Sequence, residues 1–156
     1  MTEAFDPASH TVVPPRGFDD LSVGETFAMP SRTMTDALFA AFQLASGDNH
    51  PIHYDVEYCK RHGHRGLLAH GFQVMIQTCI GAGPLAHAIG DALIGFIEAS
   101  AKWHGPVHAG DTVYPAVEII DLERQNTTGV VTVRATVHNQ NGDLVMDGEQ
   151  KYLLRL

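Results

Sequence analysis

The stretch Gly71-Phe72-Gln73-Val74-Met75-Ile76-Gln77-Thr78-Cys79-Ile80 predicts a long central helix around which the rest of the chain is expected to fold. Apolar residues recur there at i, i+3, i+4, i+7 and i+8, the spacing of one helix face. They are Phe72, Met75, Ile76, Cys79 and Ile80. Gly81-Ala82-Gly83-Pro84 ends or bends the helix, because proline cannot continue its hydrogen bonds, and a shorter helical piece is expected over 85–89. A helix with one apolar face needs a second layer to bury it.

That second layer follows as a series of strands. We expect strands at residues 93–99, 112–120, 131–138 and 146–154. The first is a continuous apolar run typical of a central strand, and the last two alternate apolar and polar side chains with period two. Pro115 indicates a bulge or a sheet edge, and Asn141-Gly142 is a strong hairpin signal.

The N-terminal half is predicted from its capping residues. A short strand is plausible over Gly24–Thr33, and Thr35 is a suitable N-cap for a helix that Gly47 would end. Asp55 is placed to cap a short helix over 56–61. The sequence therefore predicts an α+β fold, with one antiparallel sheet of about five strands wrapped around the central helix.

Composition limits both domain count and partners. The chain has 156 residues, enough for one domain. Residues 1–17 contain three prolines and no periodicity, so we expect a tail or strap there. A single domain is then expected over 18–156. The formal charge of -8 disfavours a nucleic-acid partner. No apolar run approaches the length of a membrane helix, and no basic and apolar leader begins the chain. With only two cysteines in no metal or redox spacing, these features favour a cytoplasmic protein.

The candidate chemistry lies in Ser46-Gly47-Asp48-Asn49-His50-Pro51-Ile52-His53, followed by Ala69-His70-Gly71. Asp48 and His53 are an acid and an imidazole five residues apart in a turn that Pro51 restricts, as proton transfer beside a carbonyl requires. Backbone N–H groups at Gly71 could stabilise the resulting enolate. Each residue also has an ordinary structural explanation, because aspartates often close turns and a lone histidine is usually a half-buried polar residue.

The stretch 46–55, which ends in Tyr54-Asp55, resembles the signature of the MaoC-like, or (R)-specific, enoyl-CoA hydratases of the hot-dog fold. The likeness covers nearly the whole chain, from about Phe18 to Leu156. Weaker motifs look like that family and occur in the expected order: Arg32-Thr33, Ala69-His70-Gly71 and Pro106-Val107 with Gly110-Asp111. The resemblance implies a hot-dog domain over 18–156 that pairs with a second subunit through a continuous sheet, in a homodimer or a higher homo-oligomer.

The resemblance also implies a reaction and its residues. The protein would be a hydro-lyase of fatty acid metabolism that reversibly hydrates trans-2-enoyl thioesters, R-specific, with acyl-CoA or acyl-carrier-protein thioester as substrate and no cofactor. Asp48 and His53 correspond to the catalytic pair, and the Gly71 amide to the group that binds the thioester carbonyl. His50 stands where the family usually has asparagine, with Asn49 one position earlier; an imidazole can replace one hydrogen bond of an amide.

Other residues near the motif have supporting or alternative roles. We expect His70 to fix the helix entrance through a backbone hydrogen bond, and Arg65 either to face a phosphate or carboxylate or to lie solvated in its loop. An acyl tunnel or ordinary core packing would explain Phe72, Met75, Leu93, Phe96 and Trp103. A loop metal site could use His50 and His53 with His62 or His64, but no cysteine or H-E-x-x-H pattern supports one, so we expect no metal.

Two other functions remain open on the sequence. A hot-dog thioesterase would share the fold and hydrolyse the acyl thioester, because fold alone does not choose between reactions. A non-catalytic acyl-thioester binding subunit would explain the change at His50 as a loss of activity.

Overall fold

Three long strands near the C-terminus form the middle of an antiparallel sheet, because their alternating side chains can cover a helical layer on one face. The computed structural model describes residues 4–156. The long strands are β5 (Thr112–Arg124), β6 (Thr128–Asn139) and β7 (Leu144–Arg155). Four shorter strands flank them: β1 (Thr26–Ala28), β2 (Arg32–Thr33), β3 (Leu93–Ala99) and β4 (Lys102–Trp103). The sheet order is β1-β5-β6-β7-β3, with β2 on β5 and β4 on β7.

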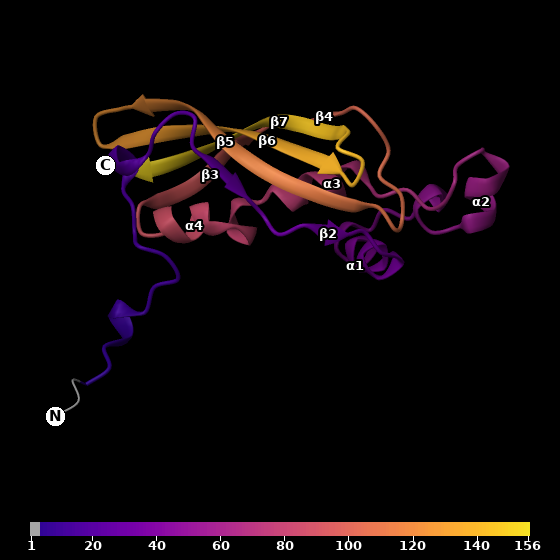
Figure 1. The fold of residues 1–156 in the computed structure, drawn as a ribbon, viewed down its shortest axis with the longest axis horizontal. Helices are drawn as coiled ribbons and strands as arrows, with labels where there is room; N and C mark the ends of the chain where they lie inside the picture. Colours follow the sequence, from indigo (N-terminus) through magenta and orange to yellow (C-terminus); the bar gives the residue numbers. More distant parts are fainter. Residues whose placement is uncertain (1–3) are drawn as a thin grey trace.

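The helical segments α1, α3 and α4 lie along one side of this sheet, and α2 lies beyond its end (Figure 1). The α-helices are α1 (Asp36–Ser46), α2 (Val56–Arg61), α3 (Gly71–Met75) and α4 (Pro84–Ile89). The 3₁₀ turns are η1 (Pro7–Ser9), η2 (Phe18–Asp20), η3 (Pro51–His53), η4 (Ile76–Thr78) and η5 (Ile80–Ala82). Within residues 4–156, none of the helices is long and apolar enough to cross a membrane.

The capping residues of the N-terminal half act as predicted. The Thr35 side chain accepts from Leu38 N–H at the start of α1, and Gly47 ends that helix with a φ of 71°. Asp55 accepts from Tyr58 N–H at 2.9 Å and begins α2. These short-range hydrogen bonds fix both helices and, with them, the loop that joins them.

The prediction of a long central helix is wrong in its extent. Only Gly71–Met75 is α-helical, and two 3₁₀ turns follow before α4. The buried residues of this segment are Gln73, Val74, Thr78 and Ile80, whereas Phe72 and Ile76 of the apolar stripe are exposed. The Thr78 side chain of this segment reaches a polar group of the sheet: Gln150 donates to the Thr78 hydroxyl at 2.7 Å and accepts from Tyr152 at 2.6 Å.

The strand predictions need three corrections. Among residues 4–156 the sheet has seven strands instead of about five, because the segment expected as one strand over 24–33 forms both β1 and β2 and because β4 was not predicted. The apolar β3 lies at the edge of the sheet, not in its centre, since it pairs only with β7. Pro115 lies within β5, opposite the break between β1 and β2, so its missing N–H costs no hydrogen bond to a neighbouring strand.

Two apolar clusters make up the core, one beneath each half of the sheet. The first joins Phe18, Leu85 and Ile89 to the long strands. The second joins Met34 and Phe39 to the long strands and includes Cys59 and Val74. The second cluster supports α1, the loop after it and the start of α3, so it fixes the elements that carry the motif residues.

The segment of residues 4–17 runs away from the sheet over much of its length (Figure 1). It joins the rest of the molecule at Arg16, whose N–H donates to the Ala88 carbonyl at 2.7 Å and whose guanidinium pairs with Glu25 at 2.8 Å. The division of the chain at residues 17 and 18 stays a prediction.

Candidate active site

The motif residues come together around a hollow of about 380 Å³. It is formed by the end of α1, the loop after it, η3, the start of α3 and β4. Its lining consists of Phe42, Ser46, Asp48, His53, His70, Gly71, Phe72 and Trp103. Aromatic walls and a few polar groups make this a plausible place to bind part of an organic ligand.

Asp48 lies in the loop just after the glycine that ends α1. Its carboxylate accepts from the backbone N–H of His50 at 3.1 Å, and its own N–H donates to the Ser46 hydroxyl at 3.2 Å. The hydrogen bond from His50 N–H lowers the pKa of the Asp48 carboxyl, and the nearby imidazoles of His70 and His53 lower it further. The side chain is half exposed, so Asp48 presents a carboxylate at the mouth of the hollow.

His53 is held by a single short hydrogen bond. Its Nδ1 lies 2.7 Å from the Leu68 carbonyl, which can only accept, so Nδ1 carries a proton and Nε2 is the basic atom in the neutral ring. Burial lowers the pKa of His53, and His70 also lowers it, against opposing effects of Leu68 and Asp48. His53 therefore favours the neutral form that can accept a proton at Nε2.

His70 completes a close group with this pair. One carboxylate oxygen of Asp48 and one ring nitrogen each of His53 and His70 all lie within 4.8 Å of one another. The two imidazole rings are stacked with 3.6 Å between centroids and 23° between planes. Lone pairs in nearly parallel planes do not converge on one ion, so this geometry suits proton transfer better than metal coordination.

Gly71 opens α3, where the backbone N–H groups of the first turn have no partner within their own helix. Trp103 donates from its indole Nε1 to the Gly71 carbonyl at 2.9 Å. A Cβ at position 71 would lie 3.0 Å from the indole Cε2, so any other residue would force Trp103 to shift by a few tenths of an ångström. Because α3 has only five residues, its dipole is small, and the Gly71 N–H would act mainly as a local hydrogen-bond donor.

His50 and Asn49 hold the loop and do not line the hollow. The His50 Nδ1 accepts from Ile52 N–H at 3.3 Å, so the imidazole caps η3 as an asparagine side chain could. Its ring packs edge-on against Tyr58, with centroids 5.7 Å apart. The Asn49 side chain accepts from Gln43 and ties the loop to α1.

Arg65 does not line the hollow. Its guanidinium donates to both carboxylate oxygens of the buried Asp111 at 2.6 Å. Asp111 also accepts from His108 N–H and from Gln140. The carboxylate that Arg65 faces is thus part of its own chain, in a bond that anchors the loop before α3 to the start of β5.

Two site residues were not found from the sequence. The Tyr54 hydroxyl lies 2.9 Å from His70 Nε2, and the Phe42 ring packs on His70 with centroids 4.7 Å apart. Tyr54 directly follows His53, and that adjacency was the available signal. Of the residues expected in an acyl tunnel, Phe72 and Trp103 line the hollow, whereas Leu93 packs against the core. Met75 and Phe96 line a separate apolar hollow of about 270 Å³.

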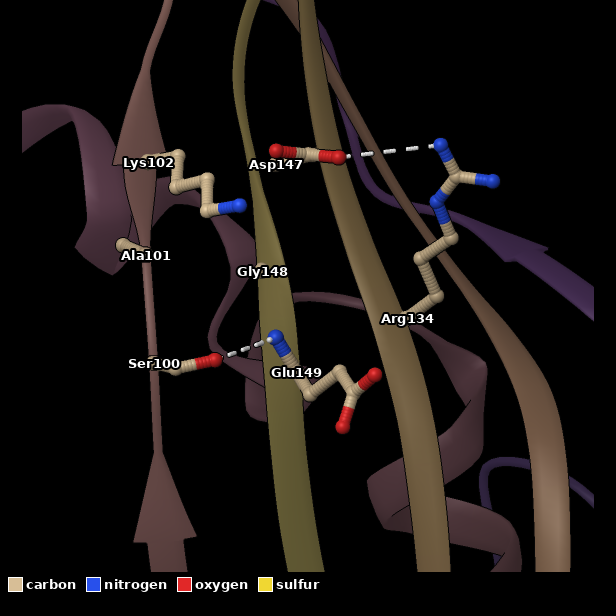
Figure 2. A pocket seen from close by; sticks show the side chains of 7 residues that line it. All are labelled: Ser100, Ala101, Lys102, Arg134, Asp147, Gly148 and Glu149. Carbon is tan, nitrogen blue, oxygen red and sulfur yellow. Dashed lines mark hydrogen bonds and ion pairs between the residues drawn. The ribbon is translucent and has the colours of Figure 1, made fainter.

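A further hollow of about 400 Å³ lies between β4 and β7 (Figure 2). Its Asp147 accepts from His104 at 2.8 Å and lies 3.7 Å from Arg134, and the hydrogen bond from His104 lowers its pKa. The Ser100 hydroxyl accepts from the Glu149 N–H. Its principal acid is thus already paired, which leaves the group around Asp48 and His53 as the candidate for catalysis.

Residues 16–148 match the family model described as the FAS1-like dehydratase domain region. The chain belongs to this family. It is 26% identical over 136 residues to the (R)-specific enoyl-CoA hydratase of Rhodospirillum rubrum, covering 85% of this chain and 87% of that one. It is 28% identical over 137 residues to the mitochondrial 3-hydroxyacyl-[acyl-carrier-protein] dehydratase of Arabidopsis thaliana, covering 86% and 78%. A crystal structure of a monoamine oxidase regulatory protein from Archaeoglobus is similar with a TM-score of 0.84 at 26% identity, covering 94% and 98%.

These comparisons confirm two expectations from the sequence. The chain is a member of the MaoC-like, (R)-hydratase type of hot-dog dehydratase family, and its fold is the α+β hot-dog fold with an antiparallel sheet. It is related to hydro-lyases at about the level of 26% identity.

Proposed function

We propose that this protein is an R-specific hydratase and dehydratase of acyl thioesters, which adds water to a trans-2-enoyl thioester or removes it from the 3-hydroxyacyl product. The observation that carries the proposal is the placement of Asp48 and His53 in one hollow beside Gly71. Relatives named as enoyl-CoA hydratase and hydroxyacyl-carrier-protein dehydratase support the same reaction class, with CoA or a carrier protein on the thioester.

The proton transfers follow from the resting charges of the pair. Asp48 is ionised and His53 favours the neutral state, so neither holds a proton to give to the substrate. The proton that reaches the α-carbon must come from the water whose oxygen bonds to the β-carbon. Imidazole is a stronger base than a carboxylate, so His53 Nε2 accepts that proton and then delivers it to the α-carbon. Asp48 orients the water and stabilises the transient imidazolium.

Charge on the thioester oxygen needs a separate partner. As the β-carbon gains oxygen, the thioester becomes an enolate, and the Gly71 N–H is our candidate donor to its oxygen. The aromatic rings of Phe72 and Trp103 line one side of the hollow, where the acyl thioester could pack against them.

We also propose that the working form is a homodimer, made through a surface we call the outer face. It consists of Ile76, Cys79, Ile94, Phe96 and Ile97, all exposed and carried by β3 and the turns after α3. Ile76, Cys79 and Phe96 line one apolar hollow. An apolar edge strand would template aggregation unless it is paired, and a second copy of β3 can pair with it. Free Cys59 and Cys79 are consistent with the cytoplasm, where we place the enzyme.

Hydration of crotonyl-CoA, followed by loss of the enoyl absorbance, tests the function. Asp48→Asn and His53→Ala should each lower kcat/KM by about 10²- to 10⁴-fold while circular dichroism stays unchanged. His62→Gln removes an exposed histidine that stacks on Tyr58 and should keep full activity. Unaltered turnover in either site variant would contradict the proposal. Release of free CoA from a saturated acyl-CoA would point to a thioesterase, and tight binding without hydration to a non-catalytic subunit.

A further inference from the structure

His70 is a third imidazole in the site and, unlike Asp48 and His53, it is almost wholly buried, with an exposed fraction of 3%. One face of its ring stacks on His53. Phe42 packs against the ring at a tilt of 47°. His70 is thus a wedged ring that covers His53, and it makes no side-chain hydrogen bond that caps its own helix.

The contacts of His70 indicate which of its nitrogens carries the proton. The Tyr54 hydroxyl donates to the Phe39 carbonyl at 3.5 Å, so its oxygen can accept from His70 Nε2–H at 2.9 Å. The Asp48 carbonyl, 3.4 Å from Nε2, can only accept as well. Nδ1 is buried without a hydrogen-bond partner among residues 4–156. A buried lone pair without a partner is tolerated better than a buried N–H without one, so the neutral tautomer of His70 carries its proton on Nε2.

We propose that His70 is a positioning residue whose buried ring covers one face of His53 and keeps that imidazole neutral and oriented to accept a proton. The proposal deepens the hydratase function and rests on it for the purpose of the neutral base. The covering ring excludes water that would otherwise solvate an imidazolium. A proton on His70 would have the same effect, because two parallel cations separated by 3.6 Å repel each other.

The other titratable groups around His53 do not explain its neutral form in place of the His70 ring. Asp48 attracts the imidazolium and so opposes neutrality, as does the hydrogen bond to Leu68. His50 disfavours the imidazolium, but its ring is 6.3 Å away and exposed, and Tyr54 contacts His53 only edge-on at 5.9 Å. Burial is the largest cause of the lowered pKa of His53, which agrees with a ring that covers one of its faces.

Titration of His53 by NMR in the substrate-free protein tests the cover without relying on activity. With the ring signal assigned through His53→Gln, the midpoint should move to higher pH in His70→Ala, which exposes the ring face to water. His70→Phe keeps an uncharged ring over His53 and should leave the midpoint low. His62→Gln is the matched control, because the His62 ring stacks on Tyr58 and not on His53. It should leave the His53 midpoint unchanged. If His70→Ala fails to fold, His70→Gln, which also lacks a ring, takes its place with the same expectation.

An unchanged His53 midpoint in the ring-free variant, or an equal rise in that variant and in His70→Phe, would overturn the proposal. Crotonyl-CoA hydration as a function of pH gives a second readout, in which the acid limb of kcat/KM should move with the NMR midpoint. We expect a loss of about threefold or more at pH 6 and a change below about twofold at pH 8. A moved midpoint in a protein that hydrates no enoyl thioester would support the cover and overturn the proposed reaction instead.

Discussion

Residues 46–71 and residues 72–97 follow one another along the chain, yet the first segment is held largely by hydrogen bonds of its own polar groups while the second leaves apolar groups uncovered. In the first, Asp55 and His50 each cap the helical turn that follows them. In the second, Phe96 and Ile97 are more than half exposed on an edge strand. The first segment can be built by one chain, whereas the second is complete only when another surface covers it.

Of the substitutions that test this difference between the two segments, Phe96→Glu should have the largest effect. A carboxylate on the outer face cannot be buried without a partner, so the dimer dissociation constant should rise about 100-fold or more, as measured by sedimentation. Val23 is exposed to a similar extent, 60% against 57%, and Val23→Glu serves as the control that should leave the dimer intact. A dimer that survives Phe96→Glu would show that the outer face is not the interface.

Gly71→Ala tests the first segment where it is most crowded. The added Cβ would lie 3.0 to 3.3 Å from three indole atoms of Trp103, so the indole must shift by a few tenths of an ångström. We expect kcat/KM for crotonyl-CoA to fall by about tenfold to a hundredfold, since the carbonyl donor and the wall both shift. Gly66→Ala is the matched control, because nothing lies within 4 Å of its Cβ position, and it should change kcat/KM by less than about twofold. Equal losses of kcat/KM in both variants would contradict a specific role for Gly71.

Asp111→Asn tests how the first segment is anchored to the sheet. Although burial opposes ionisation, the hydrogen bonds from His108 N–H, Arg65 and Gln140 hold the pKa of Asp111 below its ordinary value. A carboxyl with a lowered folded pKa stabilises the protein above its unfolded pKa of about 3.9, and that stability is lost as pH falls through the folded pKa.

At pH 7 we expect Asp111→Asn to cost about 2 kcal/mol of unfolding free energy, a modest value because the Arg65 side chain is 60% exposed. The difference from the wild type should shrink as the pH is lowered toward 3 in urea titrations. Asp91→Asn, at an exposed position, should cost less than about 0.5 kcal/mol at any pH. A difference that stays constant with pH would mean that the charge of Asp111 is not what stabilises the anchor.

The limits of sequence-based prediction follow the same division of the chain. The bounds of α1 and α2 were predictable because their signals, Thr35, Gly47 and Asp55, act over two to four residues. The apolar stripe after Gly71 was misleading because periodicity identifies a face but not its surroundings: Phe72, Ile76 and Cys79 of that stripe are exposed, whereas Ile80 is buried. The pairing of Arg65 with Asp111 joins residues 46 apart, and the stack of His53 on His70 depends on how the two segments pack. Neither contact has a local signal.

His50→Asn should have the smallest effect, and it separates loop capping from catalysis. The imidazole accepts from Ile52 N–H and packs on Tyr58, and it does not line the hollow, so asparagine can take over its capping bond. We expect unfolding free energy to change by no more than about 0.5 kcal/mol and kcat/KM by less than about twofold. His50→Ala removes the acceptor and should cost about 1 kcal/mol while leaving kcat/KM similarly unchanged. If asparagine instead raised hydration by an order of magnitude, His50 would be the residue that limits activity, and the loop would be adapted to binding more than to turnover.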